Sequence, residues 1–274
     1  FGGMVISKRV KQFLRKYPPK HHWDIDSKKA TNTFFCLTEF IQQDPIAFFE
    51  TFNKQVCKVA TDYQQIWLRL RDVKRAKHQT YLSEIEHSDF KVFEHVLESI
   101  PAHSQLQVSN SAIIRYAQLF SIKKTVNVFC NRGTSGIDGS TSTAIGAAFS
   151  SENQTVFITG DLSFFYDSNA LWNAHIPTSF RIIIINNSGG GIFKIIPGPS
   201  TTNAAAYFET PHCLTAADLS KMHGFEYQVA ATTENVQNEL LQFYEPSEKP
   251  KILEIFTPSA KNDLVLTAYF KYIK

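Results

Sequence analysis

Two short apolar runs, each stopped by polar and glycine residues, constrain the fold of this chain most strongly. Val156–Thr159 is followed by Gly160–Asp161, and Ile182–Ile185 is followed by Asn186–Asn187 and three glycines. Short β-branched runs bounded by turn residues are typical of strands buried on both faces of a parallel sheet. The residues between the two runs have helical spacing. The sequence therefore predicts a right-handed βαβ unit with two neighbouring parallel strands.

The polar residues that stop these strands predict a ligand site. In a βαβ unit Asp161 and Asn187 lie together at the carboxyl edge of the sheet, where open α/β sheets bind ligands. A carboxylate, an amide oxygen and glycine carbonyls form an oxygen-only set, which suits Mg²⁺ held jointly with phosphates. A helix beginning near Ser163 would direct its amides at the same anion. The alternative is that Asp161 is only a helix N-cap and Asn187 part of an ordinary turn.

Polar residues also follow two earlier predicted strands. Leu106–Val108 is followed by Ser109–Ser111, and Val126–Cys130 is followed by Asn131–Arg132. Glycines then lead into a predicted small-residue helix, Ala144–Phe149, which is able to pack close to a sheet. With the two strands above, four predicted strand ends place polar groups at one edge. This convergence indicates a ligand site more strongly than any single motif.

Three stretches carry a resemblance to a known family. The motif GD, followed farther along by NN, resembles the diphosphate and Mg²⁺ motif of thiamine-diphosphate enzymes, although most of these read GDG and this chain reads GDLS. GDLS, NNSGGGIF and NRGTSGIDGSTSTAIG together resemble the menaquinone-pathway synthases of that family, which join 2-oxoglutarate to isochorismate. The resemblance covers nearly the whole chain and implies a thiamine-diphosphate-binding fold of the α/β class. The NRGTSGIDG stretch is its most specific part.

The resemblance implies thiamine diphosphate and Mg²⁺, or Mn²⁺, as cofactors. The implied metal ligands are the Asp161 carboxylate, the Asn187 amide oxygen and the Gly189 carbonyl. Ile137 matches the bulky aliphatic side chain that props the cofactor in a V shape, with an ordinary core role as the alternative. The residues implied to bind the cofactor are Ser135, Gly136, Ile137, Gly160, Asp161, Leu162, Ser163, Asn187, Gly189 and Ile192.

The resembled synthases take substrates with several carboxylates, which arginine binds bidentately. Ser111 and Arg115 are four residues apart on a predicted helix and are implied to hold isochorismate. Arg132 is implied to hold 2-oxoglutarate, and Lys8 and Arg9 match a basic pair that the family's middle domain extends into the cleft. Surface salt bridges are the alternative for these basic residues. The implied apolar lining, for which a core role is the alternative, is Ile192, Phe193 and Ile196.

The resemblance also divides the chain. Residues 1–78 are the expected remnant of a transhydrogenase-like middle domain with a connecting helix, and residues 79–274 are the expected diphosphate-binding domain. From Gln105 onward, strands and helices alternate as in a doubly wound parallel sheet, ending in strands at Glu226–Ala230 and Lys251–Phe256. The aperiodic segment Ile196–Ala206 is either a mobile lid or a plain surface loop.

The N-terminal part is predicted from local signals. A helix is expected from Lys8 to about Tyr17, followed by strands at His21–Ile25 and Asn32–Leu37 and a helical turn at residues 38–40. Asp44 before Pro45 predicts a helix start, because an N-cap residue precedes proline at the first helical position. A helical pattern with local breaks then continues to about residue 100.

The chain starts without Met inside apolar text, so we expect it to be the C-terminal part of a longer protein. Resembled enzymes activate the cofactor with a glutamate from a pyrimidine-binding domain that precedes this stretch and works across a subunit interface. The catalytic residue is therefore expected outside this chain, and the chain alone is expected to be inactive. A homodimer or homotetramer is expected for the full-length protein.

Composition excludes several other classes. A net charge of +3 is too mild for nucleic-acid binding, and the basic stretch Arg69–Lys77 lacks interleaved aromatics. No apolar run is long enough to span a membrane. Four scattered cysteines without a CxxC pair favour a reduced, cytoplasmic protein. Two alternatives stay open: another carboligase or decarboxylase of the family, similar to acetolactate synthase, and a non-catalytic Rossmann-like nucleotide-binding module, although no GxGxxG follows the first strand.

Overall fold

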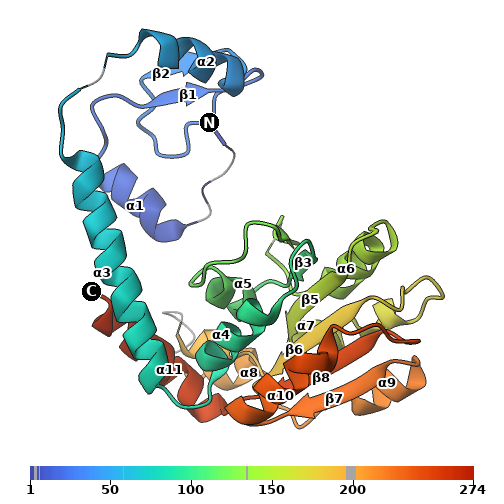
Figure 1. Cartoon of the computed structure of the whole chain (residues 1–274). Helices are drawn as coiled ribbons and strands as arrows, with labels where there is room; N and C mark the ends of the chain where they lie inside the picture. Colours follow the sequence, from blue (N-terminus) through green and yellow to red (C-terminus); the bar gives the residue numbers. More distant parts are fainter. Residues whose placement is uncertain (3–4, 6, 58, 134, 196–201) are drawn as a thin grey trace. The chain divides into compact units, whose positions relative to one another are not determined.

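The structure is a computed structural model that describes residues 1–2, 5, 7–57, 59–133, 135–195 and 202–274 (Figure 1). The chain folds into two compact units, Phe1–Trp67 and Leu68–Lys274. Their junction lies inside helix α3 (Tyr63–Glu84), which also contains the expected domain boundary at residue 78. The assignment of the two parts to a middle domain and a diphosphate-binding domain stays a prediction.

The described part of unit 1 contains a pair of parallel strands and two helices before α3. Helix α1 (Lys8–Lys16) agrees with the prediction, and β1 (Trp23–Ile25) pairs in parallel with β2 (Glu39–Ile41). Helix α2 (Pro45–Gln55) begins where the sequence predicts. The Asp44 carboxylate accepts two backbone N–H groups of its first turn, at 2.9 and 3.2 Å.

Two expectations for unit 1 are wrong. Residues 32–37 form turns and irregular backbone instead of a strand, and residues 38–40 overlap strand β2 instead of forming a helical turn. The Asn32 side chain accepts the Leu37 N–H at 3.1 Å and closes the intervening loop. An asparagine that bonds to nearby backbone offers the chain an alternative to a strand ladder.

Unit 2 is built on a six-stranded parallel sheet in its described part, with the order β4-β3-β5-β6-β8-β7 (Figure 1). The predicted doubly wound parallel sheet is confirmed. The chain passes from β3 to β4 on one side and returns to β5 on the other, so the strand order reverses between β3 and β5. The strands are β3 (Gln105–Val108), β4 (Asn127–Cys130), β5 (Thr155–Gly160), β6 (Arg181–Asn186), β7 (Glu226–Ala230) and β8 (Lys251–Phe256).

Helices cover both faces of this sheet because alternate strand residues point to opposite sides. Ile183 and Ile185 of β6 belong to one buried apolar cluster, and Ile182 and Ile184 belong to the other. Burying each such side chain contributes about 1.5–3 kcal/mol. The first cluster is covered by α4 (Asp89–Ser99), α5 (Ala112–Ala117), α10 (Thr233–Phe243) and α11 (Ser259–Tyr272), and the second by α6 (Ser140–Phe149), α7 (Asp161–Tyr166) and α9 (Ala217–Met222).

The connection between β5 and β6 differs from the prediction. Instead of one long helix, α7 begins at Asp161 and ends at Tyr166, and a 3₁₀ turn, η1 (Ser168–Leu171), follows. The Asn173 side chain then bonds to the backbone on both sides, donating to the Ala170 carbonyl at 2.8 Å and accepting the His175 N–H at 2.9 Å. These local bonds end the helical path early. Helix α11 was not predicted.

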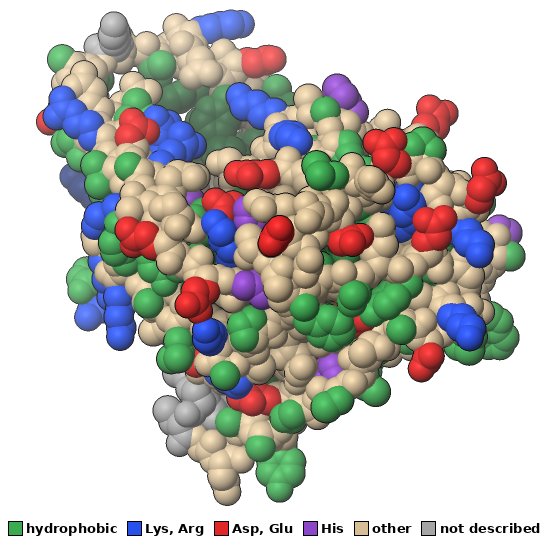
Figure 2. All heavy atoms as spheres, turned by 60° about the horizontal axis from the view of Figure 1, so that its bottom comes forward, with side chains coloured by type: hydrophobic (Ala, Val, Ile, Leu, Met, Phe, Trp, Pro, Cys, Tyr) green, Lys and Arg blue, Asp and Glu red, His purple; other side chains and the backbone are tan. Residues whose placement is uncertain are grey.

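The sequence predicts a mild overall charge and no membrane-spanning segment. Figure 2 shows Lys and Arg side chains interspersed with Asp and Glu on the face it presents, in keeping with the mild net charge of +3. Of the helices in the described ranges, none combines the length and apolarity that crossing a membrane requires.

Candidate cofactor and metal site

The ends of β5 and β6 meet at one edge of the sheet. Gly160, the last residue of β5, is in register with Ile185 of β6. Asp161 directly follows the first strand, and Asn187 directly follows the second. The predicted placement of Asp161 and Asn187 at neighbouring strand ends is confirmed. The two ends are tied together by the Gly189 N–H, which donates to Asp161 Oδ2 at 2.9 Å.

The Asp161 carboxylate is buried, with only 3% of the residue exposed. Its Oδ1 accepts the Leu162 N–H at 2.7 Å, and His212 Nε2 lies 3.2 Å from Oδ2. His212 Nδ1 accepts the Leu214 N–H at 3.1 Å, so Nε2 is the ring nitrogen left to carry a hydrogen; it lies close to Asp161 without the geometry of a hydrogen bond. Burial raises the pKa of Asp161, and the backbone donors and His212 oppose that rise.

The Asn187 side chain has its two polar atoms in different surroundings. Its Nδ2 donates to Asp89 Oδ2 at 2.9 Å. Its Oδ1 is buried and has no hydrogen-bond partner among the described residues. A buried acceptor without a partner is uncommon, because losing its water costs about 1–3 kcal/mol. This oxygen is therefore the atom of the site that most clearly needs a ligand.

Gly189 is required by its backbone conformation and by its neighbours. Its φ is +144°, and a Cβ at this position would lie 2.5 Å from the Glu209 carbonyl oxygen. The next residue, Gly190, donates to that same carbonyl at 2.6 Å, so the glycine turn is bonded to the end of α8 (Ala205–Glu209). The Gly189 carbonyl accepts the Gly191 N–H at 3.0 Å and keeps a second lone pair.

These oxygens are the kind that Mg²⁺ prefers. The set comprises one buried carboxylate of Asp161, the partnerless amide oxygen of Asn187 and the backbone carbonyl of Gly189. Mg²⁺ takes few protein ligands and shares its coordination with substrate phosphates and water. Within the described ranges no cluster of three His, Cys, Asp or Glu side chains could hold a metal. The donor set fits a hard cation bound by mixed side-chain and backbone oxygens.

The loop after β4 is held against β3 by a buried asparagine. Asn110 Nδ2 donates to the carbonyls of Asn131 and Gly136, at 3.1 and 2.8 Å, and its Oδ1 accepts from Arg132 Nη1 at 2.6 Å. Ser163 Oγ donates to the Ile137 carbonyl at 2.7 Å, which ties the same loop to α7. The predicted cofactor residues Gly136, Ile137 and Ser163 are thus joined through one bonded network.

Arg115 and Arg132 form a pair of like charges at this edge. Burial lowers the pKa of the Arg115 guanidinium, and the nearby Arg132 lowers it further. Neither arginine makes an ion pair within the described part of the chain. Two neighbouring cations without an acidic partner favour an anionic ligand.

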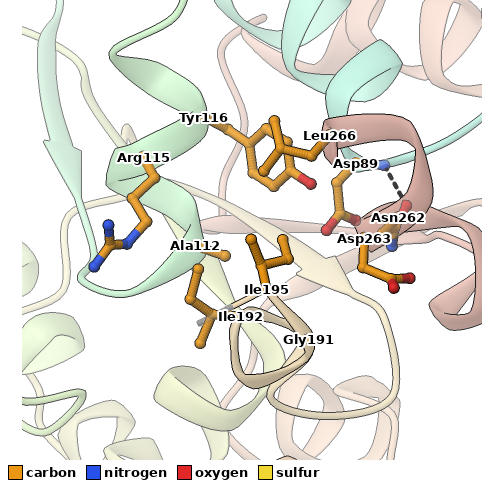
Figure 3. Close-up of a pocket in the computed structure, with 10 residues that line it drawn as sticks. All are labelled: Asp89, Ala112, Arg115, Tyr116, Gly191, Ile192, Ile195, Asn262, Asp263 and Leu266. Carbon is orange, nitrogen blue, oxygen red and sulfur yellow. Dashed lines mark hydrogen bonds between the residues drawn. The ribbon is translucent and has the colours of Figure 1, made fainter. Parts of the chain in front are cut away.

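A small pocket lies between α4, α5, α11 and the turn η2 (Gly191–Lys194). Figure 3 shows Arg115 on one side of this pocket and Asp89 with Asp263 on the other, with Ile192 and Ile195 between them. Ile192 is buried, as expected for an apolar lining residue. The pocket therefore places the apolar side chains of Ile192 and Ile195 near Asp89, the residue that bonds to Asn187.

The remaining predicted site residues are distributed as follows. Ser111, at φ +70°, precedes α5, and Phe193 packs its ring 5.1 Å from that of Phe208. Lys8 and Arg9 lie exposed in α1 of unit 1. Ser135 is exposed. Ile196 lies outside the described residues, as does the rest, up to residue 201, of the segment expected to be either a lid or a surface loop.

Sequence reasoning missed three residues of this region: Asp89, Asn110 and His212. Asp89 and His212 are distant in the chain from the residues that they contact, and no local pattern marks them. Asn110 had a signal, because it belongs to the polar stretch Ser109–Ser111 after the buried end of β3, but no role was assigned to it individually.

Residues 111–255 match the family model described as "Thiamine pyrophosphate enzyme, C-terminal TPP binding domain". The chain belongs to the thiamine pyrophosphate enzymes. Thiamine pyrophosphate is the same molecule as thiamine diphosphate, so the family resemblance read from GDLS and NNSGGGIF is confirmed.

Two curated relatives of this chain share one enzyme name. The chain is 52% identical over 272 residues to the 2-succinyl-5-enolpyruvyl-6-hydroxy-3-cyclohexene-1-carboxylate synthase of Flavobacterium johnsoniae, covering 99% of this chain and 49% of the relative. It is 50% identical over 275 residues to the synthase of the same name from Christiangramia forsetii, covering 100% of this chain and 48% of the relative. The chain thus spans about half the length of the curated relatives that it matches.

A solved structure supports the fold. The benzoylformate decarboxylase from Polynucleobacter necessarius superposes with a TM-score of 0.52 at 18% identity, covering 62% of this chain and 33% of that chain. At this identity the similarity concerns the fold alone.

Proposed function

We propose that the protein carrying this chain is a thiamine-diphosphate- and Mg²⁺-dependent transferase of menaquinone biosynthesis. It would decarboxylate 2-oxoglutarate and add the remaining four-carbon unit to isochorismate in a 1,4-addition. The observation that carries this proposal is the pair Asp161 and Asn187, brought to neighbouring strand ends in a chain about half identical to the named synthases. We further propose that the protein is cytoplasmic and homo-oligomeric.

The residues proposed to bind the cofactor and the metal ion lie in the hydrogen-bonded network at the sheet edge or beside it. Asp161, the Asn187 Oδ1 atom and the Gly189 carbonyl would hold the metal ion, whose positive charge would favour binding of the diphosphate. When bound, the cofactor supplies a nucleophilic carbon and an electron sink for decarboxylation. Ile137 would support the bent cofactor from its loop, whose position is fixed by Ser163. The groups proposed to contact the diphosphate and complete the pocket are Ser135, Gly136, Gly160, Leu162, Ser163 and Ile192.

Substrate carboxylates are proposed to bind the arginine pair. Arg115, with Ser111, would hold isochorismate, and Arg132 would hold the 2-oxoglutarate end. An anion between the two guanidiniums would relieve the repulsion that lowers the pKa of Arg115. Lys8 and Arg9 are proposed to bind the carboxylates of the same substrates. Ile192, Phe193 and Ile196 are proposed to form the apolar lining of the substrate pocket.

The chain contains only part of the proposed machinery. No residue of this sequence is assigned the role of the activating glutamate, which we propose lies in a pyrimidine-binding domain outside the sequence. Residues 1–78 would be the remnant of the middle domain and residues 79–274 the diphosphate-binding domain. A protein that consists of residues 1–274 alone should therefore not turn over substrate.

The test is an assay of the full-length protein with thiamine diphosphate and Mg²⁺. We expect release of CO₂ and formation of the coupled product when both 2-oxoglutarate and isochorismate are supplied, with the product mass measured by mass spectrometry. Pyruvate alone serves as the control substrate. Turnover of pyruvate without coupling to isochorismate would instead indicate a carboligase of the acetolactate-synthase type.

A binding measurement separates an enzyme from a nucleotide-binding module. We expect thiamine diphosphate with Mg²⁺ to raise the Tm of the full-length protein, and NAD to leave it unchanged. A rise with NAD alone would contradict the proposal. Carboligation by residues 1–274 alone would contradict the assignment of the activating glutamate to another domain.

A further inference from the structure

Two adjacent asparagines at the end of β6 are each held by a buried carboxylate. Asn186 Nδ2 donates to Glu254 Oε1 at 2.7 Å, and Asn187 Nδ2 donates to Asp89 Oδ2 at 2.9 Å. Successive strand residues point to opposite faces, so the two carboxylates approach from opposite sides of the sheet. Glu254 comes from the neighbouring strand β8, whereas Asp89 comes from the first turn of α4.

The Asp89 carboxylate is held by a hydrogen bond at each of its two oxygens, one of them from Asn187. Its Oδ1 accepts the Thr257 hydroxyl at 2.5 Å, and its backbone N–H donates to Asn262 Oδ1 at 2.9 Å, the bond drawn in Figure 3. Asn262 Nδ2 in turn donates to Thr257 Oγ1 at 3.2 Å. Asp89 is 3% exposed. A buried carboxylate with this many partners has one orientation available, and so do the groups bonded to it.

The bond to Asp89 decides which end of the Asn187 amide faces the metal site. An ionised carboxylate only accepts hydrogen bonds, so it takes the amide NH₂ group and repels the amide oxygen. Asn187 Oδ1 then points away from Asp89, where it is buried without a partner among the described residues. An amide turned the other way would direct two N–H hydrogens at a cation.

We propose that Asp89 is a positioning residue of the metal site, which holds the Asn187 amide so that its oxygen faces the divalent ion. This inference rests on the proposed function, because it assumes that Asn187 is a metal ligand. Partners that orient metal ligands in this way typically contribute about 10–100-fold in metal affinity. Asp89 lies outside residues 111–255, the part that matches the family model, so the inference adds a contact from a separate helix.

The test measures Mn²⁺ binding to the full-length protein, with thiamine diphosphate present, from the electron paramagnetic resonance signal of the free ion. Asp89→Leu removes the acceptor at similar size, and we expect about a 10–100-fold weaker Mn²⁺ Kd. Asp89→Asn keeps the volume and the fold and permits either amide orientation, so we expect a smaller loss. Circular dichroism confirms that each variant is folded.

Glu254→Gln is the matched control. It alters a buried carboxylate that holds the adjacent asparagine in the same way, without touching Asn187. We expect it to lower the free energy of unfolding while leaving the Mn²⁺ Kd close to that of the wild type. A general loss of packing would weaken Mn²⁺ binding in both variants, whereas loss of amide orientation weakens it only in the Asp89 variants.

An exchange of the two groups provides a rescue. In the double variant with Asp89→Asn and Asn187→Asp, the amide at position 89 can donate to the carboxylate at position 187. An oxygen then faces the ion whichever way the carboxylate is turned. We expect this double variant to recover most of the Mn²⁺ affinity lost in Asp89→Asn alone.

The outcomes separate this inference from the proposed function. If the wild-type protein does not bind Mn²⁺ with thiamine diphosphate, the proposed function is wrong and the role of Asp89 falls with it. If the wild type binds and the folded Asp89 variants bind equally well, only the role of Asp89 is wrong. Equal losses in the Asp89 variants and in Glu254→Gln would also overturn it.

Discussion

The Asp161 carboxylate accepts the Gly189 N–H at 2.9 Å and so connects the carboxyl ends of β5 and β6. The bond joins residues 28 positions apart and is buried. It places the carboxylate beside a glycine turn whose own carbonyl is one of the proposed metal ligands. The conformation of this turn and the charge of Asp161 therefore act on the same site, and each can be changed separately.

Gly189→Ala should destabilise the protein by about 2–4 kcal/mol, because the added Cβ meets a carbonyl oxygen and φ is positive. Urea denaturation, followed by circular dichroism, measures the free energy of unfolding. Gly146→Ala is the control, since a Cβ there meets nothing within 4 Å and alanine favours the helical backbone of α6. Equal stability of Gly189→Ala and wild type would show that the turn is not constrained as described.

Asp161→Asn should abolish the stabilisation by thiamine diphosphate and Mg²⁺, because it removes the only carboxylate among the proposed metal ligands. A ligand at 100 times its Kd stabilises a protein by about 2.7 kcal/mol, which a thermal-shift titration detects readily. Asp263→Asn, which changes a carboxylate that lines the nearby pocket, should keep the shift. An undiminished Tm shift in Asp161→Asn would exclude Asp161 as a ligand.

Much of the sheet could be predicted because its strands are buried on both faces. The runs at β5, β6 and β8 are short, buried and bounded by turn residues, and all three are found where expected. The edge strand β7 is partly exposed and is also found where expected. Prediction was weaker where single side chains compete with regular structure. Asn32 and Asn173 redirect the backbone by local hydrogen bonds, and neither effect follows from apolar periodicity.

Stability should depend on pH through Asp89. Burial raises the pKa of this carboxyl from 3.8 to about 6, so the folded protein binds the proton more tightly than the unfolded chain. Protonation of Asp89 therefore stabilises the fold, and this contribution, about 3 kcal/mol, is lost as the pH rises from about 4 to about 6.

The measurement is the difference in free energy of unfolding between wild type and Asp89→Asn across this pH range. We expect the wild type to lose stability relative to the variant as the pH rises to about 6, and the difference to be constant above it. A difference that is independent of pH would show that Asp89 is not held with a raised pKa.

The arginine pair should determine substrate affinity without affecting cofactor binding. We expect Arg115→Gln to raise the KM for isochorismate, and Arg132→Lys to raise the KM for 2-oxoglutarate, each by at least about tenfold, the size of a lost charge-assisted hydrogen bond. Arg71→Gln, at an exposed ion pair on α3, is the control. The Kd for thiamine diphosphate should remain unchanged in all three variants. Increases of the same size for both substrates in either variant would contradict the separate assignments.

The candidate site could be predicted only in part. Asp161 and Asn187 each follow a recognisable strand, so parallel pairing alone brings them together. Asp89 is 98 residues from Asn187 and contacts it only because α4 packs on that face of the sheet. A contact of this kind depends on the three-dimensional packing, and no spacing in the sequence indicates it.

The most direct test of this account is an anomalous-diffraction map of full-length protein crystals grown with thiamine diphosphate and Mn²⁺. We expect one Mn²⁺ peak within about 2.2 Å of an Asp161 carboxylate oxygen, Asn187 Oδ1 and the Gly189 carbonyl, adjoining the diphosphate. A peak elsewhere in the protein, or cofactor density away from the ends of β5 and β6, would contradict it.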